Sequence, residues 1–157
     1  MRAIAEAIDE PLVFLKAPTS PELVRSWLPP AWQVEQTGTL MLLDNLPSEG
    51  RRLPRGYASI TQDNDVAQVD LVTPDGACAA RGRMVVVDGV AVHDRIRTED
   101  AHLRRGLGTA VMTILGQIAR ARGARFGMLS ATDLGVALYA TLGWHAVAPY
   151  TTAQLPA

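Results

Sequence analysis

The sequence predicts an α/β protein whose sheet is mixed, mostly antiparallel and flanked by helices. Apolar, alternating segments separated by tight-turn signals between residues 56 and 89 predict an antiparallel meander. Residues 89–131 then follow the order strand, glycine-rich loop, amphipathic helix and strand, which is the order of a parallel crossover unit. A sheet that contains both kinds of connection has to be mixed.

Length and composition favour one folded domain over residues 1–157. Hydrophobic residues make up 48% of the chain and charged residues 20%, the balance of an ordinary globular protein. No apolar run approaches the ~20 residues of a membrane span, and the N-terminal stretch is acidic where a signal peptide is basic and then apolar. We therefore expect a cytoplasmic protein with no membrane partner. Cys78 is the one cysteine, which excludes an internal disulfide, and we expect it to be a half-buried side chain.

Charge is distributed unevenly along the chain. Residues 1–80 have a net charge of −5, whereas residues 81–157 have a net charge of +4. This asymmetry suits a polyanionic cofactor beside the second half and a cationic amine near the first, although chance on a solvated surface explains it equally well. Nucleic acid is not expected as a partner, because the chain has a net charge of −1 and a single lysine, Lys16.

The first fifty residues predict small elements around one well-defined helix. Residues 3–8 form a helix or a strand, and residues 12–15 form a short strand. Ser20 followed by proline is a favourable helix start. The apolar face of this helix is expected to comprise Leu23, Val24, Trp27 and Leu28. Extended segments follow at residues 32–34 and 39–43.

The meander comes next, after a loop at residues 47–55. Its strands are predicted at residues 56–61, 66–72, 77–87 and 90–97. Its turns are predicted at Gln62–Asp65, Thr73–Gly76 and Asp88–Gly89. Along the last strand, strict alternation places Asp94 in an otherwise apolar row with Val90, Val92 and Ile96, whereas His93 faces the other way unless a β-bulge intervenes.

The glycine-rich loop opens the longest predicted helix. Its apolar stripe comprises Leu107, Ala110, Val111, Ile114, Leu115 and Ile118, and Gly123 lies just beyond its end. The first N–H groups of a helix have no internal partner, and glycines leave the backbone accessible, so this end favours an anion such as pyrophosphate. Turn chemistry alone is the alternative explanation of the glycines. A strand at residues 126–131 and a short helix at residues 133–144 follow.

The second half of the chain resembles the GNAT superfamily of acyl-CoA-dependent N-acyltransferases, over roughly residues 85–148. The family's phosphate loop, Q/R-x-x-G-x-G/A, corresponds here to Leu103, Arg104, Arg105, Gly106, Leu107 and Gly108. Its later block, a tyrosine shortly before leucine, glycine and an aromatic residue, corresponds to Leu138, Tyr139, Leu142, Gly143 and Trp144. Leu103 departs from the pattern, because the family prefers Gln or Arg there.

The resemblance implies a transferase that uses acetyl-CoA or another short acyl-CoA, with no metal. In the family, the strands before and after the helix splay apart, and the acyl-pantetheine arm lies between them. The residues that this implies for cofactor binding are Ile96, Thr98, Leu103, Arg104, Arg105, Gly106, Leu107, Gly108, Thr109, Ala131 and Tyr139. No three histidines or acids show the spacing of metal ligands.

The resemblance also implies direct N-acetyltransferase chemistry, with transfer to a primary amine of a small molecule or peptide. Tyr139 matches the family's general acid, with packing of a short helix as the alternative. Asp94, twelve residues before Gly106, is the candidate base, with a salt bridge to a nearby arginine as the alternative. His93 and water are the other candidates for the base.

The N-terminal part is expected to help form the acceptor site. Trp27 and Trp32 are candidates to line it, although core packing is the favoured role of both. Apolar strand edges at residues 144–148 would permit a homodimer. Two other functions stay open: a catalytically silent acyl-CoA-binding sensor, and an interaction domain in which Gly106 and Gly108 only shape a turn.

Overall fold

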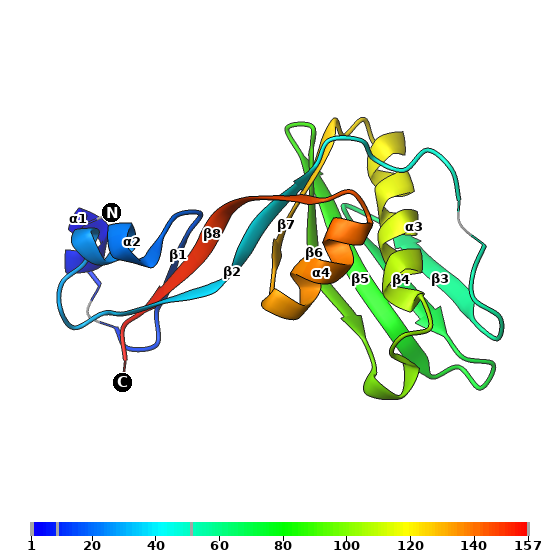
Figure 1. Ribbon diagram of the computed structural model, residues 1–157, viewed down its shortest axis with the longest axis horizontal. Helices are drawn as coiled ribbons and strands as arrows, with labels where there is room; N and C mark the ends of the chain where they lie inside the picture. Colours follow the sequence, from blue (N-terminus) through cyan, green and yellow to red (C-terminus); the bar gives the residue numbers. More distant parts are fainter. Residues whose placement is uncertain (1, 9, 51, 157) are drawn as a thin grey trace. The chain divides into compact units, whose positions relative to one another are not determined.

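The computed structural model describes residues 2–8, 10–50 and 52–156 (Figure 1). Its strands make a mixed sheet of eight strands with flanking helices, as predicted. The chain divides into two compact units: unit 1 comprises Met1–Met41, Ser130–Thr141 and His145–Ala157, and unit 2 comprises Leu42–Leu129 and Leu142–Trp144. Within the described residues, no helix is long and apolar enough to cross a bilayer.

Unit 2 contains the predicted meander and crossover. Its strands lie in the order β7-β6-β5-β4-β3. Their bounds are Ala58–Asp63 (β3), Val66–Val72 (β4), Cys78–Val87 (β5), Val90–Thr98 (β6) and Phe126–Ala131 (β7). Only residues Phe126–Leu129 of β7 belong to unit 2. The pairs β3–β4, β4–β5 and β5–β6 are antiparallel. The pair β6–β7 is parallel. The predicted turns at Thr73–Gly76 and Asp88–Gly89 and the mixed character of the sheet are therefore confirmed. The first turn is narrower than predicted, because Gln62 and Asp63 still pair within β3.

Helix α3 (Leu107–Ala121) lies on one face of this sheet, over β4, β5 and β6 (Figure 1). Its buried side includes Leu107, Ala110, Val111, Leu115 and Ala119, which confirms most of the predicted stripe. The helix packs closely because Gly82 of β5 lacks a side chain: a Cβ there would lie 2.6 Å from Val111 Cγ1 and 3.0 Å from Leu115 Cδ1. A short 3-10 helix, η1 (Asp100–His102), precedes the loop that leads into α3.

Unit 1 contains the remaining helices and strands. These are α1 (Arg2–Glu6), β1 (Phe14–Ala17), α2 (Pro21–Trp27), β2 (Gln33–Leu43), α4 (Asp133–Thr141) and β8 (His145–Gln154); the last two residues of β2 belong to unit 2. The strand order is β1-β8-β2, followed by the end of β7. Helices α1 and α2 lie together beside this sheet (Figure 1). Their core comprises Ala5, Ala17, Val24, Leu28, Trp32 and Ala153.

Two predictions for the first fifty residues need correction, and two are confirmed. The segments predicted at residues 32–34 and 39–43 belong to one continuous strand, β2, except that Trp32 lies just before its start. Ser20 is the N-cap of α2 as predicted, and its hydroxyl accepts a hydrogen bond from the N–H of Leu23. The side chain of Leu23 is nevertheless exposed and does not belong to the apolar face of α2. Trp32 is buried in the core and Trp27 packs against it, which confirms the core role for both.

Candidate functional site

The loop before α3 in unit 2 ends in a helix N-terminus that is open to an anion. Gly106 is the N-cap residue, in the left-handed conformation with φ of 75°. The first bond within the helix runs from the N–H of Ala110 to the carbonyl of Gly106, at 3.1 Å. The main-chain N–H groups of residues 107–109 therefore precede the hydrogen-bonded turn, and the first turn contains no acidic residue. Both features favour a bound anion.

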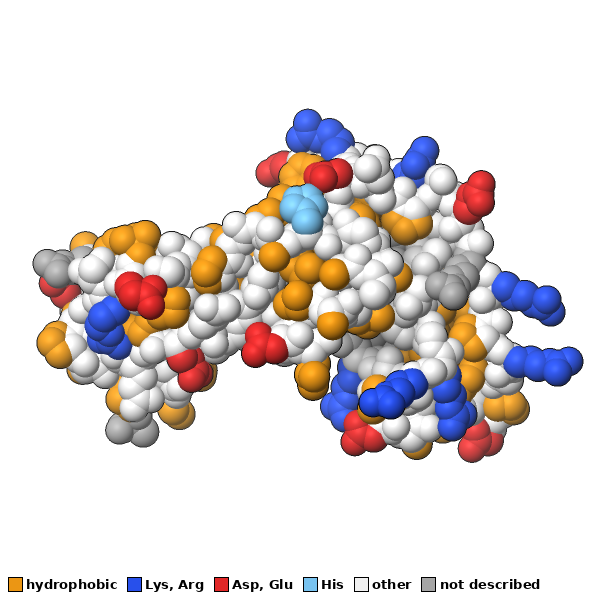
Figure 2. Space-filling model, viewed as in Figure 1, with side chains coloured by type: hydrophobic (Ala, Val, Ile, Leu, Met, Phe, Trp, Pro, Cys, Tyr) orange, Lys and Arg blue, Asp and Glu red, His pale blue; other side chains and the backbone are white. Residues whose placement is uncertain are grey.

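The side chains of this loop add positive charge. Leu103, Arg104 and Arg105 are exposed, and Arg104 has a left-handed φ of 58°. Figure 2 shows basic side chains gathered at the end of unit 2 where Figure 1 shows the connection between β6 and α3. Leu107 is fully buried, so that only its main chain can contact a ligand. A Cβ at Gly106 would meet no protein atom within 4 Å, which leaves room above the helix end.

Tyr57, in the loop before β3, makes hydrogen bonds to two residues near the start of α3. The Tyr57 hydroxyl lies 2.8 Å from Nδ1 of His102, and Arg105 Nη1 donates a hydrogen bond to the same hydroxyl at 3.0 Å. This contact was not predicted from the sequence. His102 is accordingly half-buried, and the only sequence signal for the contact was a tyrosine at the end of an arginine-rich loop, which is too common a pattern to be specific.

The parallel strands pair over a short stretch only. Val90, Ala91 and Val92 of β6 pair with Phe126, Gly127 and Met128 of β7. In the described chain no further pair between the two strands follows, although β6 continues to Thr98. The second half of β6 is thus hydrogen-bonded through β5, and its other edge is available to a ligand.

A β-bulge interrupts β6 and changes which side chains share a face. Asp94 pairs with Arg83 and Arg97 pairs with Arg81, so two residues of β6 lie opposite Gly82, and one of them, Arg95, has φ of 52°. Ile96 therefore points toward α3, where its Cδ1 would lie 2.5 Å from a Cβ at Gly82. Strict alternation was wrong here: Asp94 does not share a face with Ile96. Thr98, which pairs with Ala80, ends the strand.

Asp94 is exposed and paired with arginines. Its side chain is 66% accessible, and its Oδ2 lies 3.4 Å from Nη2 of Arg83 and 3.6 Å from Nε of Arg95. The salt-bridge role considered for this residue is therefore present in the structure.

His93 lies on the opposite face and is enclosed. Its ring meets that of Trp144 edge-on, with centroids 5.2 Å apart, and its Nδ1 lies 3.1 Å from the carbonyl oxygen of Ala91. Its Nε2 is buried without a hydrogen-bond partner in the described chain. Burial lowers the pKa of His93 to about 4, against the opposing effect of the main chain of Ala91 and Met128. The imidazole is therefore neutral at pH 7. Trp144 itself is buried, so it forms no exposed strand edge.

Tyr139 belongs to α4 of unit 1. Its side chain is 8% exposed, and burial raises the pKa of its phenol above the ordinary value of 10.0. Gly135 leaves room for the ring, because a Cβ there would lie 3.1 Å from Tyr139 Cε2 and 3.6 Å from the Cβ of Ala131. Ala131, at the end of β7, is buried beside it. Within unit 1 the structure thus brings Tyr139 and Ala131 together and keeps the phenol protonated at neutral pH.

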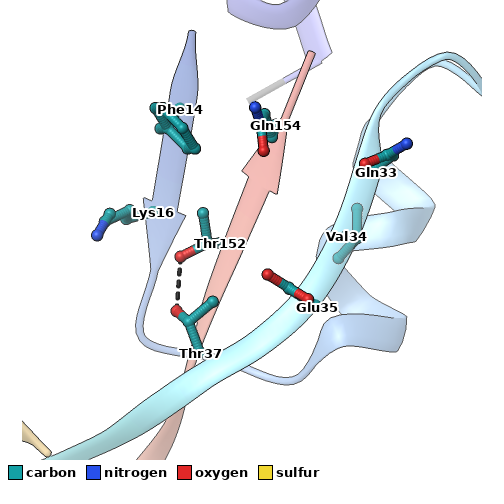
Figure 3. Close-up of a pocket in the computed structure, with 8 residues that line it drawn as sticks. All are labelled: Phe14, Lys16, Gln33, Val34, Glu35, Thr37, Thr152 and Gln154. Carbon is teal, nitrogen blue, oxygen red and sulfur yellow. Dashed lines mark hydrogen bonds between the residues drawn. The ribbon is translucent and has the colours of Figure 1, made fainter. Parts of the chain in front are cut away.

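Unit 1 also has a shallow hollow of about 410 Å³ on its three-stranded sheet (Figure 3). Its lining comprises Phe14, Lys16, Gln33, Val34, Glu35, Thr37, Thr152 and Gln154. The hydroxyls of Thr37 and Thr152 in its lining lie 2.6 Å apart and form a hydrogen bond with each other (Figure 3). The hollow offers hydrogen-bonding groups for a small polar molecule.

Metal ligation finds no support in the described residues. They contain no group of three or more His, Cys, Asp or Glu side chains that could hold a metal ion. Cys78 is half-buried, as expected, and its Sγ lies 3.5 Å from the carbonyl oxygen of Ala80.

Comparison with known proteins adds matches at the level of structure. No family model and no curated protein match this chain. A GCN5-related N-acetyltransferase from Kribbella flavida superposes with a TM-score of 0.66 at 18% identity, over 80% of this chain and 60% of that one. A GCN5-related N-acetyltransferase from Sphaerobacter thermophilus gives 0.70 at 13% identity, over 99% and 64% of the two chains. A tandem GNAT protein from the clavulanic acid biosynthesis pathway gives 0.71 at 14% identity, over 99% and 68%.

This chain thus spans only 60% to 68% of the length of these three proteins. At such identities the matches concern the fold, and they agree with the architecture found above: a mixed sheet, one short parallel pair and a helix that follows a glycine loop. The chain therefore has the fold of the GNAT superfamily, the GCN5-related N-acetyltransferases.

Proposed function

We propose that this chain is an acyl-CoA-dependent N-acyltransferase that transfers acetyl, or another short acyl group, directly from the coenzyme to a primary amine. The fold supports acyl transfer in general. The observation that carries the proposal lies within unit 2. The open N-terminus of α3 follows β6 after the connection of residues 99–106, and the second half of β6 has no pairing with β7 among the described residues. One feature suits a pyrophosphate and the other an extended pantetheine arm.

The residues present fit the diphosphate of coenzyme A. Main-chain N–H groups at Leu107, Gly108 and Thr109 are free of helical partners, and Gly106 leaves the approach to them open. Arg104 and Arg105 add two guanidinium groups. Ile96 and Thr98 lie on the stretch of β6 that leads to this loop, and Leu103 would contribute only its main chain. When bound, acetyl-CoA supplies the activated thioester.

We assign Tyr139 the role of general acid. Its phenol has an ordinary pKa of 10.0 that burial raises further, so it is protonated at neutral pH and can donate its proton to the leaving thiolate when it is positioned on the sulfur. This assignment requires the hydroxyl to reach the sulfur during turnover.

We assign Asp94 as the group that accepts a proton from the amine, through water, or holds the ammonium form. The pH–rate profiles of the wild type and of Asp94→Asn decide between proton transfer to Asp94 and a purely electrostatic role of its carboxylate. If Asp94 is the base, Asp94→Asn lowers kcat and removes the acidic limb of the profile. If the carboxylate only anchors Arg83 and Arg95, Asp94→Asn raises KM for the amine and keeps the limb, and water or His93 accepts the proton.

Calorimetry with acetyl-CoA tests the coenzyme site through a matched pair of glycines. Gly106 and Gly123 lie at the two ends of α3 with φ of 75° and 80°, and a Cβ at either would meet no atom within 4 Å. Alanine at either position should therefore cost a similar ~1–2 kcal/mol of backbone strain. Gly106→Ala should weaken coenzyme binding, whereas Gly123→Ala should leave it unchanged.

Turnover is tested by following thiol release with a panel of amines, from polyamines and aminoglycosides to peptide N-termini and lysines. Coenzyme binding without turnover of any amine would favour the acyl-CoA sensor. No measurable binding at millimolar acetyl-CoA would rule out the proposal and leave Gly106 as turn chemistry.

A further inference from the structure

Four arginines gather on one face of the sheet in unit 2. Arg81 and Arg83 lie on β5, and Arg95 and Arg97 lie on the neighbouring β6. With Gln68 and Ile96 they line a hollow of about 530 Å³. Arg81 and Arg97 are direct cross-strand partners, an arrangement of like charges that destabilises a sheet. We call these four residues the arginine cluster.

The cluster faces away from α3. Gly82 separates Arg81 from Arg83, and its missing Cβ points at Val111 and Leu115 of the helix. Because neighbouring residues of a strand point to opposite faces, the two arginines project from the other side of the sheet. The bulge at Arg95 then adds a second side chain of β6 to the hollow, at a backbone φ of 52° that non-glycine residues seldom adopt.

Three carboxylates satisfy the cluster only in part. Asp70 lies 3.4 Å from Arg81, Asp94 lies near Arg83 and Arg95, and Glu99 lies 3.4 Å from Arg97. Four guanidinium groups against three carboxylates leave one positive charge. Each guanidinium has five N–H donors, and these ion pairs use one or two of them.

The exposure of two arginines and the unpaired Nε of a third indicate that the cluster can bind a further anion. The side chains of Arg95 and Arg97 are 74% and 71% exposed, so their ion pairs are weak and a stronger partner can displace them. Nε of Arg83 is buried and has no hydrogen-bond partner among the described residues. A buried donor without a partner is unfavourable, and an anion in the hollow would satisfy it once the Arg83 side chain turns to expose this atom.

We propose that the arginine cluster binds the oxyanion of the acceptor, so that the substrate is a small amine that also carries a carboxylate or a phosphate. Guanidinium groups recognise both oxyanions in a bidentate way. The inference rests on the proposed function, because the acyl group is expected beside β6, the strand that contributes Arg95 and Arg97. The amine would then meet the thioester while its anionic end is held by the cluster.

The test uses four amines of similar length: butylamine, 1,4-diaminobutane, 4-aminobutanoate and 3-aminopropyl phosphate. Each has a primary amine at one end, and they differ in the charge at the far end, where 1,4-diaminobutane carries a second amine. We expect kcat/KM of the wild type to be at least about tenfold higher for one of the two anionic amines than for the neutral and cationic ones, the size of a charge-assisted contact. The better of the two identifies the carboxylate or the phosphate as the recognised group.

Matched variants locate the effect. Arg97→Gln removes one charge from the cluster, and Arg120→Gln removes the same charge from the exposed last turn of α3. We expect Arg97→Gln to reduce the preference for the anionic amine roughly tenfold through KM and to leave butylamine unaffected. Arg120→Gln should retain the preference. An equal loss in both variants, or a wild type without preference, would overturn the assignment.

Binding of the anionic amines in the absence of coenzyme tests the anion site independently of the proposed acyl transfer. Calorimetry of 3-aminopropyl phosphate and of 4-aminobutanoate, without coenzyme, should show binding to the wild type that is weakened by Arg97→Gln. If acetyl-CoA fails to bind but the anion binds at the cluster, acyl transfer is wrong and the anion site stands. If acetyl-CoA binds and neither anion binds at up to about 20 mM, the acyltransferase stands and the anion site is wrong.

Discussion

Acid should destabilise this protein through one buried histidine. His93 is 4% exposed, and burial lowers its pKa from 6.5 to about 4. Between these two values the unfolded chain binds a proton that the folded chain does not, so the stability of the native state falls as the pH is lowered. From pH 7 to pH 5 this single difference amounts to about 2 kcal/mol. Carboxylates contribute little in this range because most of them ionise below pH 5.

The assay is urea unfolding at pH 7 and pH 5, followed by tryptophan fluorescence because Trp144 contacts the imidazole. The comparison is between the wild type and His93→Leu. Leucine cannot titrate, so its variant should lose most of the difference in unfolding free energy between the two pH values, whatever its absolute stability. A wild-type protein equally stable at both pH values, or a His93→Leu variant with the full wild-type difference, would refute this reasoning.

Three further substitutions test the site and the packing around it. Tyr139→Phe should keep the melting temperature and coenzyme affinity and slow the single-turnover rate by ~10² to 10⁴-fold, whereas a packing role predicts a neutral Phe variant and an unstable Ala variant. Tyr57→Phe removes the hydroxyl that accepts a hydrogen bond from Arg105, and by calorimetry it should weaken acetyl-CoA binding roughly fivefold; unchanged affinity would show that the hydroxyl does not order the loop. Gly82→Ala places a Cβ against the side chains of Ile96, Val111 and Leu115 under α3 and should cost ~1–3 kcal/mol in thermal unfolding. Gly50→Ala, which meets only Gln117 at 3.6 Å, should be neutral, and equal melting temperatures of the two variants would contradict this packing.

Elements with strong local signals could be predicted from the sequence. Helix α3 follows from its apolar period and its glycine ends, and the meander follows from alternation between tight turns. The N-cap of α2 follows from Ser20 before a proline. Two motifs in the right order also indicated the fold, which the structural comparisons confirm.

The sequence did not predict features that depend on partners distant in the chain. The bulge at Arg95 arises from how β6 pairs with β5, and no local pattern distinguishes it from regular alternation. It alone places Ile96 under α3 and leaves Asp94 among arginines on the other face.

The same limit applies to the contacts around the loop and in the core. Tyr57 lies 45 residues before His102, and His93 lies far from Trp144 in the chain, so only folding brings each pair together. The sequence by itself thus determined the local elements and the glycine loop, because backbone propensity and hydrophobic period are properties of neighbouring residues. The tertiary structure decided the charge pairing, the neutral histidine and the arginine cluster, because burial and electrostatics depend on which strands lie side by side.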